Sequence, residues 1–131
     1  MYVEIGNKLY TIIDASTIPN VYNYERKLAD EWYPYATISP LNWVNTVETT
    51  TQDRLVVGYT IAIYVRNKSL ATAEWEIRAY VDEIMQDLRA DEYLTGTALR
   101  GEFELERGRL NDEQPVRVCN IKCNYLLLVT I

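Results

Sequence analysis

The pattern of apolar positions is clearest near the middle of the chain, over residues 69–89. Ser69 places a hydroxyl at the start of this stretch, no Pro or Gly interrupts it, and Gly96 follows shortly after its end. The apolar residues recur at steps of three and four, which is the spacing of one stripe on an α-helix. They are Leu70, Ala73, Ile77, Val81, Ile84 and Leu88. We therefore predict one long central helix, and its apolar stripe needs a partner surface.

Stretches that alternate between apolar and polar residues predict that surface on both sides of the helix. The alternation is strongest over 54–66, and it returns over 97–106 and 116–131. The last stretch has Leu126 and Leu128 on its second face, which predicts a central place in the sheet. Residues 20–25 and 35–46 predict two earlier strands, the second interrupted at Pro40.

The remaining segments complete an α+β architecture. Residues 2–15 have helical spacing and should form a short N-terminal helix that ends before Ile18, because Pro19 cannot continue it. The polar run 46–53 has no hydrophobic face and is expected as the tip of a long hairpin. We predict a single domain over residues 1–131, an antiparallel sheet with a long hairpin, packed against the central helix and the short N-terminal helix.

Composition narrows the classes of function. Hydrophobic residues make up 48% and charged residues 24% of the chain, which is typical of a folded globular domain. The formal net charge of −6 disfavours binding to a polyanion such as nucleic acid. No apolar run reaches the ~18–20 residues of a membrane span, and the start of the chain lacks signal-peptide features. We expect no membrane partner and folding in a cytoplasm.

The usual catalytic constellations are missing from the sequence. The chain has no histidine, which excludes Ser-His, Cys-His and His-metal sites. Its five glycines form neither a dinucleotide fingerprint nor a phosphate-binding loop. Cys119 and Cys123 lie about 13 Å apart if that stretch is a strand, too far for a disulfide, and are expected as reduced core thiols. We expect no enzyme activity, no cofactor and no metal.

Three features are candidates for contacts with other molecules. Glu102, Glu104 and Glu106 share one strand face at ~6.6 Å spacing. They form either a solvated outer face or a negative surface that lines a channel or meets a basic partner. The second feature is a group of tryptophan and tyrosine residues, which anchor interfaces when exposed but also fill cores. The third is the polar hairpin tip, which is either mobile or adds strands to a neighbouring subunit. The candidate interface residues are Trp32, Tyr33, Trp43, Glu48, Thr50, Gln52 and Arg54.

Several short segments along the chain are packing and turn signals rather than reactive groups. They are Ile18-Pro19-Asn20-Val21-Tyr22 leading to Tyr24-Glu25, Tyr33-Pro34-Tyr35-Ala36-Thr37-Ile38, Ile61-Ala62-Ile63-Tyr64-Val65, Val81-Asp82-Glu83-Ile84, Leu94-Thr95-Gly96 and Val116-Arg117-Val118. In this order, and over nearly the whole chain, these segments resemble the tail terminator or tail completion proteins of long-tailed bacteriophages.

This resemblance implies a structural virion subunit, assembled in the host cytoplasm, that forms a closed ring at the head-proximal end of the tail tube. The ring is typically six-fold, stops tube polymerisation and presents a surface to the head connector. Its implied partners are further copies of itself, the tail tube protein and the connector or stopper protein, with DNA passing through the lumen. Glu102, Glu104 and Glu106 would face that lumen. The alternatives are a connector, stopper or tail-tube subunit, or a cellular α+β ligand-binding module.

Overall fold

The order of elements in the computed structural model is helix, strand, hairpin, helix, hairpin, as predicted. The structure describes residues 2–24, 33–47, 51–94, 96, 98–107 and 116–130. The elements are α1 (Tyr2–Asp14), β1 (Asn20–Tyr22), β2 (Tyr35–Val47), β3 (Gln52–Arg66), α2 (Leu70–Ala90), β4 (Arg100–Arg107) and β5 (Val116–Thr130). The α+β class and both helices are therefore confirmed.

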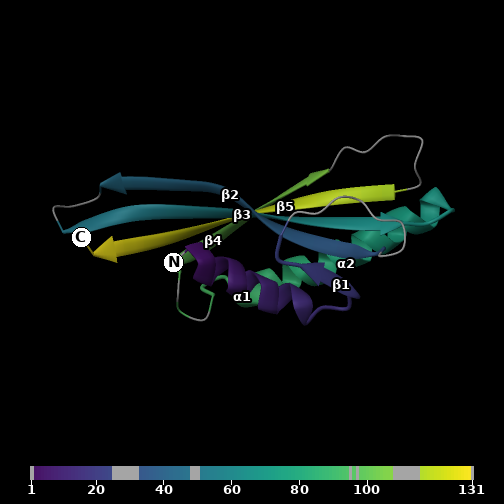
Figure 1. Cartoon of the computed structure of the whole chain (residues 1–131), viewed down its shortest axis with the longest axis horizontal. Coiled ribbons are helices and arrows are strands. Elements are labelled where there is room, and N and C mark those ends of the chain that lie inside the picture. The colour runs from purple at the N-terminus through teal and green to yellow at the C-terminus, as the bar shows by residue number, and fades with distance from the viewer. Residues whose placement is uncertain are drawn as a thin grey trace.

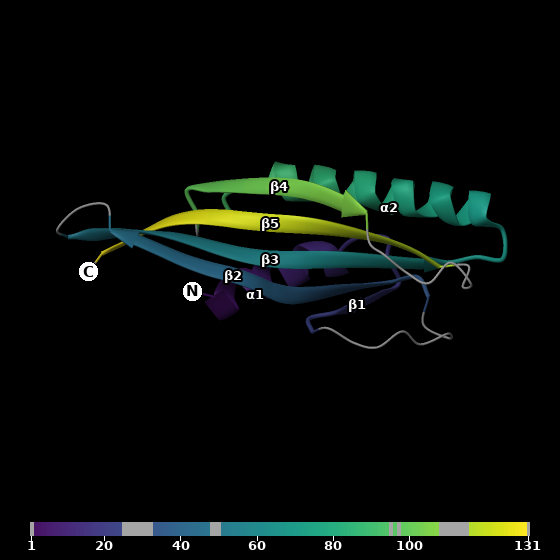
Figure 2. The same ribbon diagram turned by 90° about the horizontal axis from the view of Figure 1, so that it is seen from above.

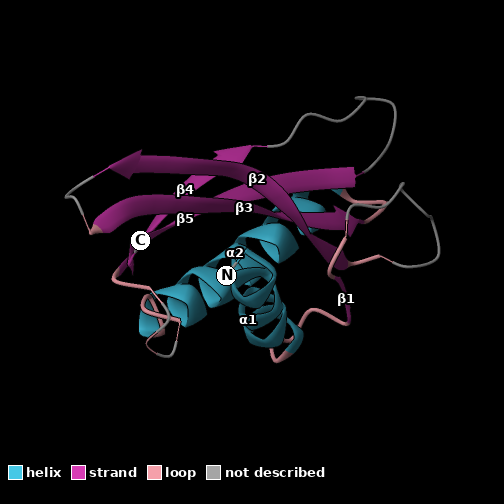
Figure 3. Ribbon diagram, turned by 60° about the vertical axis from the view of Figure 1, so that its left-hand side comes forward, coloured by secondary structure: helices cyan, strands magenta, loops and turns pink. Residues whose placement is uncertain are grey.

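The five described strands form one sheet in the order β1-β2-β3-β5-β4, and both helices lie against the same face (Figures 1 and 3). We call this the helix side and the opposite face the open side. β5 lies between β3 and β4, which confirms its predicted central place. The expectation of a purely antiparallel sheet is wrong at one edge, because β1 pairs with β2 in parallel. Propensity and alternation indicate that a segment is extended, but they do not encode the direction of its neighbour.

The strand expected over 20–25 is also shorter than predicted. β1 ends at Tyr22, and Asn23 and Tyr24 are outside it. It pairs with only the first three residues of β2, which leaves the rest of that edge of β2 without a described neighbour. The cause is tertiary, because a strand persists only where another strand supplies hydrogen bonds.

The predicted stripe of α2 faces the sheet. Ala73, Ile77, Val81, Ile84 and Leu88 are buried, whereas Leu70 in the first turn is 47% exposed. Across the interface, alternate residues of β3 and β5 are buried on the helix side. They are Leu55, Val57, Tyr59, Ile61, Ile63 and Val65 on β3, and Ile121, Cys123, Tyr125 and Leu127 on β5.

The first turn of α2 depends on its cap. The side-chain oxygen of Ser69 accepts a hydrogen bond from the backbone N–H of Thr72 at 3.3 Å. Replacing Ser69 by alanine leaves that N–H without its partner, and we expect a loss of about 1 kcal/mol in the free energy of unfolding, measured by urea denaturation. Ser69→Asp keeps an acceptor and should stay close to the parent. Equal stability of all three proteins would show that the cap contributes nothing.

The long hairpin is confirmed, and it continues past the helices. β2 and β3 pair as far as Val47 opposite Asp53, with a register shift between Pro40 and Asn42. Every residue of β2 from Pro40 onwards is exposed. In Figures 1 and 2 the ends of β2, β3 and β5 extend beyond both helices. We call residues 41–47 and 52–54 the distal hairpin.

Both cysteines are free thiols, as predicted. Cys123 is fully buried on the helix side, and burial raises the pKa of its thiol. Cys119 is half-buried. Among the helices described, none is long and apolar enough to cross a lipid bilayer.

Candidate interaction surfaces

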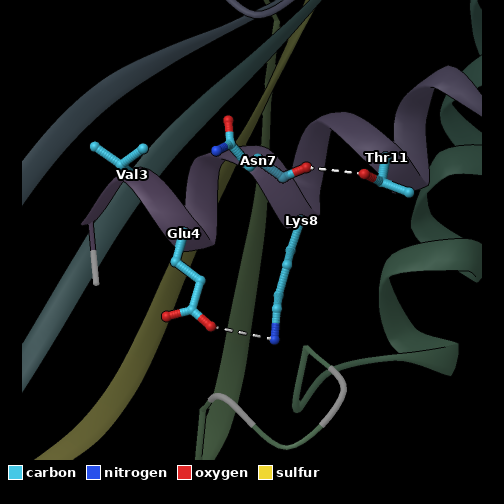
Figure 4. Close-up of a pocket in the computed structure, with 5 residues that line it drawn as sticks. All are labelled: Val3, Glu4, Asn7, Lys8 and Thr11. Carbon is cyan, nitrogen blue, oxygen red and sulfur yellow. Dashed lines mark hydrogen bonds and ion pairs between the residues drawn. The ribbon is translucent and has the colours of Figure 1, made fainter.

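The described residues contain no group of three or more Cys, Asp or Glu side chains placed to hold a metal ion. One shallow hollow follows the exposed side of α1 and is lined by Val3, Glu4, Asn7, Lys8 and Thr11 (Figure 4). Its polar groups already interact within the chain. Lys8 lies 3.6 Å from Glu4 and donates to the Leu94 carbonyl at 3.0 Å, and the Thr11 hydroxyl donates to the Asn7 carbonyl. All five side chains come from one helix, so they do not converge on a ligand.

The acidic residues of β4 form a ladder on the open side of the sheet. Glu102, Glu104 and Glu106, which we call the acidic ladder, are exposed. The residues that alternate with them, Gly101, Phe103 and Leu105, are opposite Tyr125, Cys123 and Ile121, whose side chains are buried against the helices. The alternation predicted from the sequence is thus realised, and the three carboxylates face away from the helices.

Ion pairs are unevenly distributed along the acidic ladder. Arg100 lies 2.8 Å from Glu102, and Lys122 lies 2.9 Å from Glu106. The hydrogen bond to Glu106 raises the pKa of Lys122. Glu104 stands between these pairs and is directly opposite Lys122, and its charge also raises the pKa of Lys122. Lys122 therefore partly offsets both Glu104 and Glu106, and with Arg100 it leaves the three carboxylates in excess by one charge.

The predicted interface residues do not form one patch. Trp43, Gln52 and Arg54 are all exposed on the distal hairpin. Trp43 is opposite Val57 on the helix side, whereas Arg54 points to the open side. Tyr33 lies at the other end of β2. Trp32, Glu48 and Thr50 are outside the described residues.

Tyr33 belongs to a cluster of tyrosines on the open side. Its ring lies 5.2 Å from that of Tyr35, which in turn stacks on Tyr64 at 4.6 Å and meets Tyr22 edge-on at 6.0 Å. Tyr35 is only 1% exposed, although the helices are on the other face. Aromatic packing within the chain explains that burial. Tyr22 is half-buried, whereas Tyr24 is 56% exposed.

The interface residues predicted from the sequence did not include an exposed tryptophan on α2. Trp75 is 69% exposed, and the guanidinium carbon of Arg78 lies 5.3 Å from the centre of its ring. The signal was present, because Trp75 falls two residues after Ala73 and two before Ile77 and is therefore outside the helical stripe.

A groove separates α2 from β4. It contains a cavity of about 240 Å³ with an apolar floor and a charged wall. In the wall, Arg117 Nε donates to Glu74 at 2.7 Å, and Arg78 lies 3.9 Å from the same carboxylate. The cavity is lined by Glu74, Ile77, Arg78, Leu105, Arg117, Val118 and Cys119.

Comparison with known proteins gives a structural match. No family model and no curated protein matches this sequence. A chain from the solved virion of a native gene transfer agent particle superposes with a TM-score of 0.59. The match covers 95% of both chains at 10% sequence identity. The two chains share a fold. At this identity the match carries no residue of the neighbour onto this chain.

Proposed function

We propose that this chain is a structural subunit of a phage-like virion, that it assembles as a ring, and that the ring ends the tail tube on its head-proximal side. The observation that carries the proposal is the fold match over 95% of both chains to a protein of a gene transfer agent virion. The sequence segments that resemble phage tail terminator proteins support the same role. The function of a structural virion subunit depends on surfaces that contact other copies of the chain, rather than on a ligand pocket.

The distal hairpin supplies such a surface. Leu41, Trp43, Val44 and Val47 are between 41% and 73% exposed, in the part of β2 whose residues are all exposed. The outer edge of β2 along this segment has no described strand beside it. An exposed edge with apolar side chains promotes aggregation unless it is paired, and ring closure pairs it. We therefore assign the contact between copies to the distal hairpin.

The tail-terminating role assigns partners to the two rims of the ring. One rim would contact the tail tube protein, the other the head connector or stopper, and DNA would pass through the lumen. We expect Glu102, Glu104 and Glu106 to face the lumen, because carboxylates repel the DNA backbone. A connector, stopper or tube subunit would use the same ring-forming surface at a different position along the axis from head to tail.

Two valines of equal exposure test the assembly surface. Val47 in the distal hairpin is 73% exposed, and Val3 on α1 is 72% exposed. Val47→Asp should abolish rings formed with tail tube protein, because it buries a charge in the contact, whereas Val3→Asp should leave them intact. Light scattering and negative-stain microscopy measure both.

The same experiment separates the alternatives. A ring at the upper end of the tail supports the terminator role, whereas subunits along its length indicate a tube protein, and a ring on the isolated connector indicates a stopper. A chain that stays monomeric with tube protein present, or equal loss from both aspartate variants, contradicts the proposed assembly.

A further inference from the structure

We infer that the free edge of β4 and the groove beside it bind an extended segment of a different protein, in which apolar residues alternate with lysine or arginine. The binding mode is strand addition, in which a peptide extends an exposed sheet edge and places alternate side chains on its two faces. All parts of the site lie in one copy of the chain, so the inference stands without the ring.

The backbone of β4 is the first part of the site. β4 is the last strand of the described sheet and pairs only with β5, so its other edge has no described strand beside it. In Figure 2, α2 runs along this edge and projects past it. The helix therefore provides a floor on which a sixth strand would lie.

The helix side of that edge is apolar and incompletely covered. Leu99 and Leu105 are each 52% exposed, and Phe103 between them is half-buried against the ring of Tyr125. The cavity of about 240 Å³ opens beside Leu105 and is large enough for one large apolar side chain. Every second residue of an added strand would face this surface, which selects apolar side chains at those positions.

The open side of the same edge selects the intervening residues. Cross-strand neighbours on one face interact, and like charges placed opposite each other destabilise the pairing. The acidic ladder would lie directly beside the added strand, and Glu104 at its centre shares its opposite residue, Lys122, with Glu106. Lysine or arginine at these positions complements the ladder, whereas aspartate or glutamate opposes it.

The described edge strands of a second copy do not have this pattern. β2 contains no lysine or arginine, β1 contains no charged residue, and β4 itself is acidic. β5 carries Arg117 and Lys122, but both of its edges are already paired. Charge complementarity therefore favours a foreign segment over self-association through β4.

Fluorescence anisotropy with labelled eight-residue peptides tests the charge pattern on the isolated chain. A peptide that alternates Lys and Val should bind, whereas an alternating Glu and Val peptide and a Lys-Val peptide with the residues in two blocks should not. Glu104→Lys should weaken the Lys-Val peptide at least about fivefold. Asp82→Lys on the exposed side of α2 makes the same change in net charge and should leave binding unchanged. Equal binding of the alternating and blocked peptides, or equal effects of the two lysine variants, overturns the inference.

Backbone methylation tests the strand addition itself. In a β-strand, alternate amide groups point to opposite edges, so only one alternate set can donate to β4. Of two Lys-Val peptides methylated on one set or the other, one should lose binding and the other should keep it. Equal binding of the two peptides would show that side chains alone hold them. These measurements need no assembly, so a chain that does not bind the peptides leaves the ring proposal standing. Conversely, peptide binding can still be measured on Val47→Asp if that variant forms no rings.

Discussion

Replacing Ile84 by alanine is expected to lower the free energy of unfolding by about 3 kcal/mol, within the range for removing a large buried aliphatic side chain. Ile84 is 0% exposed near the middle of the α2 stripe, where the helix crosses β3 and β5. The alanine leaves a cavity between two rigid layers that cannot close around it. Urea denaturation followed by tryptophan fluorescence measures the loss.

A residue on the same helix provides the control. Gln86 is exposed, and Gln86→Ala keeps helix propensity, so its effect should stay within about 0.5 kcal/mol. If Ile84→Ala cost no more than Gln86→Ala, α2 would not be packed on the sheet as described. The long helix would then not be the main brace of the fold.

Gly101→Val is expected to destabilise the protein by about 2 to 3 kcal/mol, in the range of overpacked cores. A Cβ atom at Gly101 would lie 2.9 Å from the Glu92 carbonyl oxygen, 2.9 Å from Tyr125 Cε1 and 3.0 Å from Phe103 Cζ. One of these atoms belongs to the backbone and another to a fully buried ring, so neither can move away easily. Thermal and urea denaturation measure the loss of stability.

The sign of this effect separates packing from strand propensity. Valine favours strands and glycine disfavours them, so propensity alone predicts a gain at position 101. Glu102→Val makes a comparable change on the open, exposed face of the same strand and should be neutral or slightly favourable. If the Gly101→Val protein were as stable as the parent, Tyr125 and the backbone near Glu92 would not crowd this position.

The sequence predicted most of the secondary structure because the spacing of apolar residues along an element reflects which of its sides is buried. Apart from Leu70 in the first turn, the stripe of α2 and the alternation of β3 appear in the structure at the expected residues, since these apolar positions face the other layer. Ser69 and Pro19 set element boundaries through backbone chemistry that also acts locally. The polar run over 46–53 was expected as the hairpin tip, but β2 extends to Val47 and β3 begins at Gln52, because the paired strands supply backbone hydrogen bonds that a polar sequence does not record.

The candidate surfaces were predictable only in part. Alternation placed Glu102, Glu104 and Glu106 on one face, and the structure keeps them exposed on the side away from the helices. It did not predict that Leu105, on the apolar face, would be half-exposed. That exposure arises because α2 packs against β3 and β5, β4 is the last described strand of the sheet, and a groove separates β4 from the helix.

The sequence by itself determined which residues are helical or extended and which side of each element is apolar. Those properties depend on contacts within a few residues along the chain and on the alternation of Cβ directions. Only the tertiary structure decided the parallel pairing of β1, the overhang of the distal hairpin and the open groove beside β4. Each depends on how far one element extends past another, and that offset is fixed by packing between segments distant in the sequence.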